Sequence, residues 1–120
     1  MKLRVSMTLA ASMLAGLMAT AAYAESKGTV VVFVPSSTNP YIGQFQLGAK
    51  EKAAELGYDI KVIENNFNQS EQDSQVQQQL ASGETVAGYI WWPFENAAGV
   101  GSLRALSQSG APVIVSNQYP

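Results

Sequence analysis

The 120-residue chain contains neither cysteine nor histidine. Without cysteine there is no disulfide and no thiol nucleophile, and without histidine the commonest general base is missing. The same two absences remove the usual ligands of transition metals. No close Asp/Glu pair is expected where a strand ends, so a glycosidase-like carboxylate pair is not predicted either. The composition therefore argues against an enzyme, and it predicts neither a metal nor a cofactor.

Residues 1–24 have the layout of a secretory signal peptide. Lys2 and Arg4 precede an apolar, uncharged stretch that ends in Ala22-Tyr23-Ala24, a small-x-small cleavage site. The alternative is an uncut membrane anchor, since about 18 apolar residues could span a bilayer, but serine and threonine dilute this stretch. Because no cysteine is available for acylation, the sequence predicts a soluble protein in the periplasm of a Gram-negative cell, beginning at Glu25.

Charge is scarce and evenly spread in the part that follows the leader. Once Lys2 and Arg4 are removed, five basic residues remain against nine acidic ones, a net charge of −4. Nucleic acid would require a basic stripe that neutralises phosphates, and an anionic membrane surface would require a Lys/Arg cluster. Neither partner is predicted. Residues 25–120 suffice for one small domain with a modest core.

The chain after the leader repeats a strand-then-helix pattern three times and closes on a fourth strand. Residues 29–34, TVVVFV, form a continuous β-branched and aromatic run, typical of a parallel strand buried on both faces. Further strands are expected at 58–63, 88–92 and 111–116, with helices at 40–56, 70–82 and 96–109. The expected fold is α/β, a three-layer sandwich with a parallel, Rossmann-like sheet.

Short signals mark the helix ends. Asn39 is expected to cap the first helix, and Gly57 to end it with a positive φ. Ser70-x-x-Asp73 resembles a capping box at the start of the second helix. In that helix the glutamines among residues 75–79 are expected to face water.

Ligands of an open parallel sheet bind beyond the carboxyl ends of its strands, near the point where the strand order reverses. Amides and aromatic rings are expected at this edge: Asn39 and Tyr41 after the first strand, Trp92 after the third, and Asn117 and Gln118 after the fourth. Rings stack on the C–H faces of a sugar, while amides both donate and accept hydrogen bonds. The mixture favours a small polyhydroxylated ligand.

Each of these residues also has a purely structural interpretation. Asn39 could serve only as a helix cap, Tyr41 could cover the sheet edge, and the pair Asn117-Gln118 could be ordinary turn residues. Adjacent strand residues point to opposite faces, so one of Trp91 and Trp92 belongs in the core, and Trp92 is the one assigned to the cleft. Phosphate binding at the serine-rich turn before Asn39 is disfavoured because the turn lacks glycine.

The order of these features resembles the type 1 periplasmic binding proteins, in particular the ribose- and galactose-type sugar-binding components of ABC transporters. The resemblance covers the chain from the leader to Tyr119. Its marks are the first strand followed by Asn39-Pro40-Tyr41-Ile42, then Gly48-Ala49, Glu55-Leu56-Gly57-Tyr58 and Gly110-Ala111-Pro112-Val113-Ile114.

The resemblance implies that Asn39 bonds a ligand hydroxyl and that Tyr41 stacks on or encloses the ring. It implies that residues 25–120 form only an incomplete N-terminal lobe and that a second lobe is missing. It also implies that the whole protein delivers a sugar-like solute to an ABC permease in the inner membrane. Ribose-type members have an Asn where this chain has Trp92, and an Asp-Arg pair where it has Asn117-Gln118. Neutral amides bond hydroxyls more weakly than charged groups do, so a bulkier or less hydroxylated ligand than ribose is expected.

Three other functions are compared with this one. A periplasmic sensor that reports ligand occupancy to a chemoreceptor or histidine kinase would use the same cleft. A flavodoxin-like enzyme would need a glycine-rich or acidic loop that the chain lacks. Repressors of the LacI type share the expected fold, but they lie in the cytoplasm behind a helix-turn-helix, and the leader argues against them.

The leader generates a first prediction. When the full chain is expressed in a Gram-negative host, the periplasmic form should be 24 residues shorter and should begin at Glu25. N-terminal sequencing of the periplasmic fraction measures this directly. An intact Met1 terminus in the membrane fraction would show that the apolar stretch is an anchor.

Overall fold

Residues 24–118 are described by the computed structural model, and they alternate strands with helices throughout. The elements are β1 (Thr29–Val34), α1 (Pro40–Leu56), β2 (Asp59–Glu64), α2 (Gln69–Ala81), β3 (Gly88–Trp91), α3 (Asn96–Gln108) and β4 (Val113–Val115). Every element predicted from the sequence is present, with bounds that differ by at most a few residues. The predicted leader up to residue 23, and Tyr119 and Pro120, lie outside the described residues.

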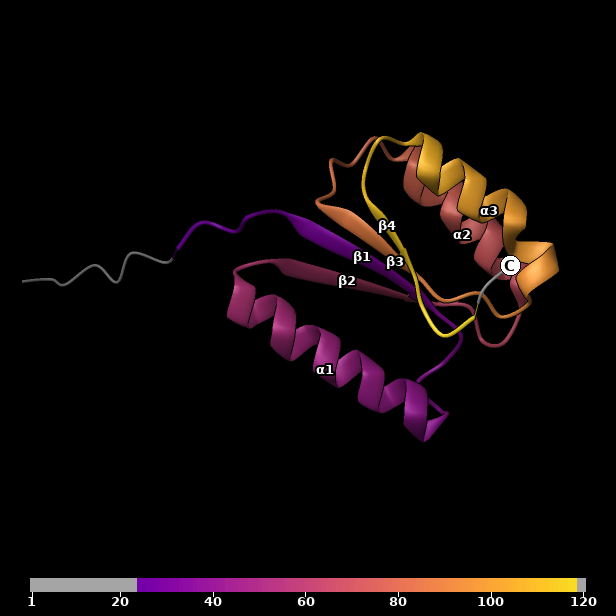
Figure 1. The fold of residues 1–120 in the computed structure, drawn as a ribbon, viewed down its shortest axis with the longest axis horizontal. Helices are drawn as coiled ribbons and strands as arrows, with labels where there is room; N and C mark the ends of the chain where they lie inside the picture. The colour runs from indigo at the N-terminus through magenta and orange to yellow at the C-terminus, as the bar shows by residue number, and fades with distance from the viewer. Residues whose placement is uncertain (1–23, 119–120) are drawn as a thin grey trace, which may run out of the picture.

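The four strands form one parallel sheet in the order β2-β1-β3-β4. Helix α1 lies on one face, and α2 and α3 lie together on the other, as Figure 1 shows. The chain runs from β1 outward to β2 and then crosses back over β1 to β3. The strand order therefore reverses between β1 and β3, and the α/β fold expected from the sequence is confirmed.

Strand β1 supplies both halves of the core. Val31 and Phe33 point into the cluster under α2 and α3, whereas Val32 and Val34 point into the cluster under α1. All four side chains are fully buried. A strand that contributes to two cores has no wet face, which is why its sequence does not alternate.

The helix ends agree with the sequence in α1 and differ in α2. Asn39 caps α1 with its Oδ1, which accepts the Tyr41 N–H at 2.9 Å, and Gly57 ends that helix at φ 84°. The predicted capping box at Ser70 is wrong. Asn68 has the extended backbone of a cap and accepts the N–H of Glu71 at 3.0 Å, so Ser70 lies inside the first turn.

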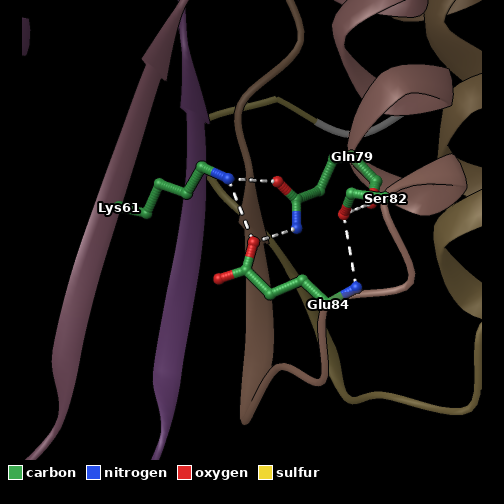
Figure 2. A network of polar contacts seen from close by, with 4 residues as sticks. All are labelled: Lys61, Gln79, Ser82 and Glu84. Carbon is green, nitrogen blue, oxygen red and sulfur yellow. Dashed lines mark hydrogen bonds and ion pairs between the residues drawn. The ribbon is translucent and has the colours of Figure 1, made fainter.

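Not all glutamines of α2 face water, contrary to the sequence prediction. Gln79 is only 4% exposed. Figure 2 shows why: its Oε1 accepts from Lys61 Nζ at 2.8 Å, and its Nε2 donates to Glu84 Oε2 at 3.0 Å. Lys61 also donates to Glu84 at 3.0 Å. The hydrogen bonds from Gln79 and Lys61 lower the pKa of Glu84, and together the three side chains tie β2 to α2 and to the loop before β3.

Among residues 24–118, no helix combines the length and the apolar composition needed to cross a membrane.

Gly99 in α3 allows the helix to approach the sheet closely. A Cβ at this position would lie 2.7 Å from Cζ2 of Trp91, a side chain that is completely buried. Gly101, two residues further along the same helix, has no atom within 4 Å of such a Cβ. The two glycines therefore form a matched pair for testing how tightly Trp91 is packed.

We expect Gly99→Ala to lower the free energy of unfolding by about 1–3 kcal/mol, because the added methyl overpacks a filled core. Gly101→Ala should instead raise it by up to about 1 kcal/mol, since alanine has the higher helix propensity. Urea denaturation of both variants measures the difference. Equal effects at the two positions would contradict the close contact between α3 and Trp91.

Candidate functional site

The ends of β1, β3 and β4 are aligned at one edge of the sheet. The Trp92 N–H donates to Phe33 C=O, and the Ser116 N–H donates to Trp91 C=O, both at 2.9 Å. Since β3 lies between β1 and β4, the residues that follow β1 and β4 are about 10 Å apart, two strand spacings. This carboxyl edge, which includes the reversal point of the strand order, is the candidate site.

The turn after β1 is stiffened by its own hydroxyl groups and presents Asn39. Ser36 Oγ lies 3.0 Å from Thr38 Oγ1 and accepts the Thr38 N–H at 3.3 Å. Oδ1 of Asn39 is engaged by the helix cap, while its Nδ2 has no hydrogen-bond partner among the described residues. The side chain is exposed. Asn39 is therefore a cap with an amide N–H₂ group still available at the edge.

The two tryptophans point to opposite faces, as the sequence predicts, but both are buried. Trp91 belongs to the core under α2 and α3. Trp92 is 5% exposed and packs under α1, edge-on against Phe45 at 5.2 Å and Tyr41 at 5.8 Å between ring centroids. The expectation that Trp92 offers its ring to a cleft is not met, because α1 covers it. The exposed ring at this edge is Tyr41, 68% exposed and supported by Trp92.

The residues after β4 form a tight turn that leaves Asn117 exposed. The Gln118 N–H donates to Ser116 C=O at 2.9 Å across Asn117, whose φ is 68°. This is the hydrogen bond of a γ-turn, with its central residue in the left-handed region that asparagine tolerates better than most residues. Asn117 is exposed and Gln118 is half-buried. They are turn residues, and their amides lie at the same edge as Asn39.

Glu64, the last residue of β2, lies half-buried beside the turn after β1. Gln46 Nε2 donates to its Oε1 at 2.6 Å. This bond, with further hydrogen bonds from Ser37 and Ser36, holds the pKa of Glu64 below its ordinary value. The carboxylate thus anchors the serine turn that leads to Asn39. The sequence signal for a role at the edge was the position of Glu64 as the last residue of β2.

Two aromatic residues that are not among the candidate ligand residues form an exposed pair near the edge. The rings of Phe67 and Phe94 meet edge-to-face at 5.9 Å, and both are more than a third exposed. Beside them lies a pocket of about 410 Å³ that Asp73 and Glu95 also line. Phe67 has a φ of 60°, a strained conformation for a bulky residue. A lone phenylalanine among asparagines in a loop was the signal that could have found it.

A large apolar groove lies elsewhere. It has a volume of about 620 Å³, runs between α1 and β4, and is lined almost entirely by apolar side chains such as Tyr58, Ile90 and Ile114. Such a lining offers few partners for hydroxyl groups. Within residues 24–118 there is no cluster of three or more acidic side chains that could hold a metal. The amide-bearing carboxyl edge remains the candidate site.

Comparison with known proteins identifies the family of the chain. A family model described as a periplasmic binding protein domain matches residues 30–120. The chain belongs to this family of periplasmic binding proteins.

Solved structures share the fold at low sequence identity. The periplasmic ribose ABC transporter protein of Conexibacter woesei DSM 14684 is 20% identical with a TM-score of 0.70, over 79% of this chain and 31% of its own. The arabinose-bound binding protein of Shewanella sp. ANA-3 is 22% identical with a TM-score of 0.63, over 72% and 28%. The transcription regulator CcpA of Lactococcus lactis is 22% identical with a TM-score of 0.61, over 73% and 31%. The chain thus spans about a third of the length of each.

The environment of Glu64 generates a prediction about acid stability. Its pKa is lower in the folded chain than its ordinary value of 4.5, so the unfolded state binds more protons. The stabilisation is therefore complete above about pH 4.5 and is lost as the pH falls through the native pKa. Glu64→Gln should lower the free energy of unfolding at pH 7 by about 1 kcal/mol, because charge-assisted bonds become neutral.

Denaturant titrations between about pH 3 and pH 7 measure this effect, and the Glu64→Gln variant should lose less stability on acidification than the parent. Glu55→Gln is the control, since its ion pair with Lys52 is exposed on both sides and should contribute little. If the two variants show the same pH dependence of stability, the hydrogen bonds to Glu64 do not stabilise the fold in this way.

Proposed function

We propose that this chain is the N-terminal lobe of a periplasmic substrate-binding protein that binds a small sugar-like solute and delivers it to an ABC permease in the inner membrane. The carboxyl edge of the sheet carries the proposal, because it collects neutral amides and hydroxyls beside the exposed ring of Tyr41. Membership in a family of periplasmic binding proteins supports it, as does the leader predicted at residues 1–24.

Each residue at the edge has a distinct role in this proposal. Asn39 donates from Nδ2 to a ligand hydroxyl while its Oδ1 continues to cap α1. Tyr41 covers a C–H face of the ligand, and Trp92 supports it from below. The amides of Asn117 and Gln118 both donate and accept on the far side of β3. Because all these groups are neutral, the ligand is recognised through hydroxyls and ring faces rather than through charge.

A single lobe supplies only part of such a site. The chain spans 31% of the length of the ribose transporter protein whose fold it shares. With one lobe, the ligand keeps much of its hydration and loses the contacts of an opposing surface, so little free energy remains after the cost of association. We therefore expect this chain by itself to bind its ligand no more tightly than about millimolar.

A sensor role is the second candidate. The fold is shared with a transcription regulator, so the architecture also serves regulatory proteins. A periplasmic sensor would use the same edge and would differ in its membrane partner, a chemoreceptor or a histidine kinase in place of a permease. Crosslinking the exported protein in cells to its membrane partner distinguishes the two.

The proposal is tested by an NMR titration of the purified chain with D-ribose, L-arabinose and D-allose, which detects millimolar binding. We expect the amide resonances of residues 39, 41 and 116–118 to shift in a saturable way with at least one sugar. The amides around Tyr58 and Ile114, in the apolar groove, serve as internal controls and should not move. Shifts confined to the groove, or none at all, would refute the proposed site.

Two substitutions at Asn39 separate binding from capping. Asn39→Asp retains an oxygen for the Tyr41 N–H but loses the Nδ2 donor, so it should weaken sugar binding about threefold or more with little change in thermal stability. Asn39→Ala removes the cap as well and should also destabilise the chain by about 1 kcal/mol. If Asn39→Asp binds as the parent does, Asn39 acts only as a cap.

A further inference from the structure

Two glutamines at the start of α2 are buried, and neither has a role in the ligand contacts proposed above. Gln69 is 5% exposed and Gln72 is 0% exposed. Burying an amide is unfavourable unless its hydrogen bonds are replaced inside the protein. Their bonding partners therefore indicate what these side chains hold in place.

Most of those partners lie in one short segment, Trp92–Glu95, between β3 and α3. Gln69 Oε1 accepts the N–H of Phe94 at 3.0 Å and the N–H of Glu95 at 2.9 Å. Gln72 Nε2 donates to Trp92 C=O at 2.9 Å. Three backbone groups of the segment are thus bound by side chains of α2.

These bonds satisfy the N–H groups that come just before α3. Glu95 occupies the cap position of α3, and its side chain makes no capping hydrogen bond. The oxygen of Gln69, distant in the sequence, accepts from the N–H groups of Phe94 and Glu95, where the chain enters the helix. If that oxygen were lost, both N–H groups would lack their partner in a part-buried loop.

The amide of Gln69 is held in the required orientation by its other side. Its Nε2 donates to Gln72 Oε1 at 3.1 Å and to Asp73 Oδ1 at 3.0 Å. Asp73 Oδ1 in turn accepts from Ser102 Oγ of α3 at 2.6 Å. Since Asp73 presents an acceptor, Gln69 must turn its N–H₂ group toward Asp73 and its oxygen toward the segment.

We infer that Gln69 and Gln72 are positioning residues for the ligand site, an inference that rests on the function proposed above. They hold segment Trp92–Glu95 against α2, and that segment carries both Trp92, which supports the exposed Tyr41 ring, and Phe94 of the exposed aromatic pair. The two glutamines touch no ligand in this arrangement. They act through Trp92, which supports the Tyr41 ring that covers the ligand.

The matched control lies on the same helix. Gln79 is as buried as Gln69, but its bonds go to Lys61 and Glu84 (Figure 2), away from segment Trp92–Glu95. Gln69→Met and Gln79→Met remove the same chemical group from equally buried positions. A general loss of stability should affect both variants alike, whereas a loss of positioning should affect only the first.

The experiment measures amide hydrogen exchange by NMR in the full chain and in both variants. We expect the amides of Phe94 and Glu95 to exchange about three- to tenfold faster in Gln69→Met, and to be unchanged in Gln79→Met relative to the global opening rate. Gln72→Met, which removes only the bond to Trp92 C=O among the bonds to this segment, provides a milder variant if Gln69→Met does not fold. It should shift the indole resonance of Trp92.

Titration with the three sugars supplies the second readout. Gln69→Met should weaken binding about threefold or more, and Gln79→Met should not. Unchanged exchange at Phe94 and Glu95, or equal weakening by both variants, overturns the inference. If the parent chain binds none of the sugars, the proposed function fails, and the exchange rates still decide whether Gln69 and Gln72 hold the segment.

Discussion

The burial of β1 on both faces is the constraint on which the rest of the structure depends. Its side chains enter two cores in alternation, and its backbone pairs with β2 on one side and β3 on the other. Helices on both faces of the sheet bury Val31, Val32, Phe33 and Val34 at once. With β1 inside the sheet, the chain must cross over it, and the crossing creates the strand reversal at whose carboxyl edge the amides gather.

Polar side chains in the interior of α2 connect that sheet to its loops at both ends. Gln79 ties β2 to the loop before β3, and Gln69 and Gln72 bind the segment after β3. An apolar helix face would contribute more burial energy but could not satisfy loop N–H and C=O groups. The glutamines therefore give up some hydrophobic stabilisation and hold two loops in defined positions.

The amides and hydroxyls at the ends of β1 and β4 are neutral, and this limits what they can recognise. Glu64 is the carboxylate closest to the turn after β1, and it is occupied in bonding Gln46 and the serines of that turn. It acts on the shape of the site, since it anchors the turn that presents Asn39. A ligand would meet amides, hydroxyls and the Tyr41 ring, groups that suit an uncharged, hydroxylated molecule.

Much of the fold could be predicted from the sequence because its signals are local. The unbroken run of residues 29–34, the Asn39 cap and Gly57 each report a backbone conformation through near neighbours, and strand alternation alone separates Trp91 from Trp92. The amides after β1 and β4 could also be assigned to one edge, because parallel strands end on the same side.

What the sequence alone could not determine is which side chains other elements cover or bind. Trp92 is the last residue before a proline and looked available, but α1 closes over it. Gln79 was expected to face water, and Gln69 precedes the helix expected at residues 70–82, yet both are buried by their partners. Local patterns specify which elements form and which face of each is apolar. Exposure depends on contacts between elements, and only the tertiary structure decides those.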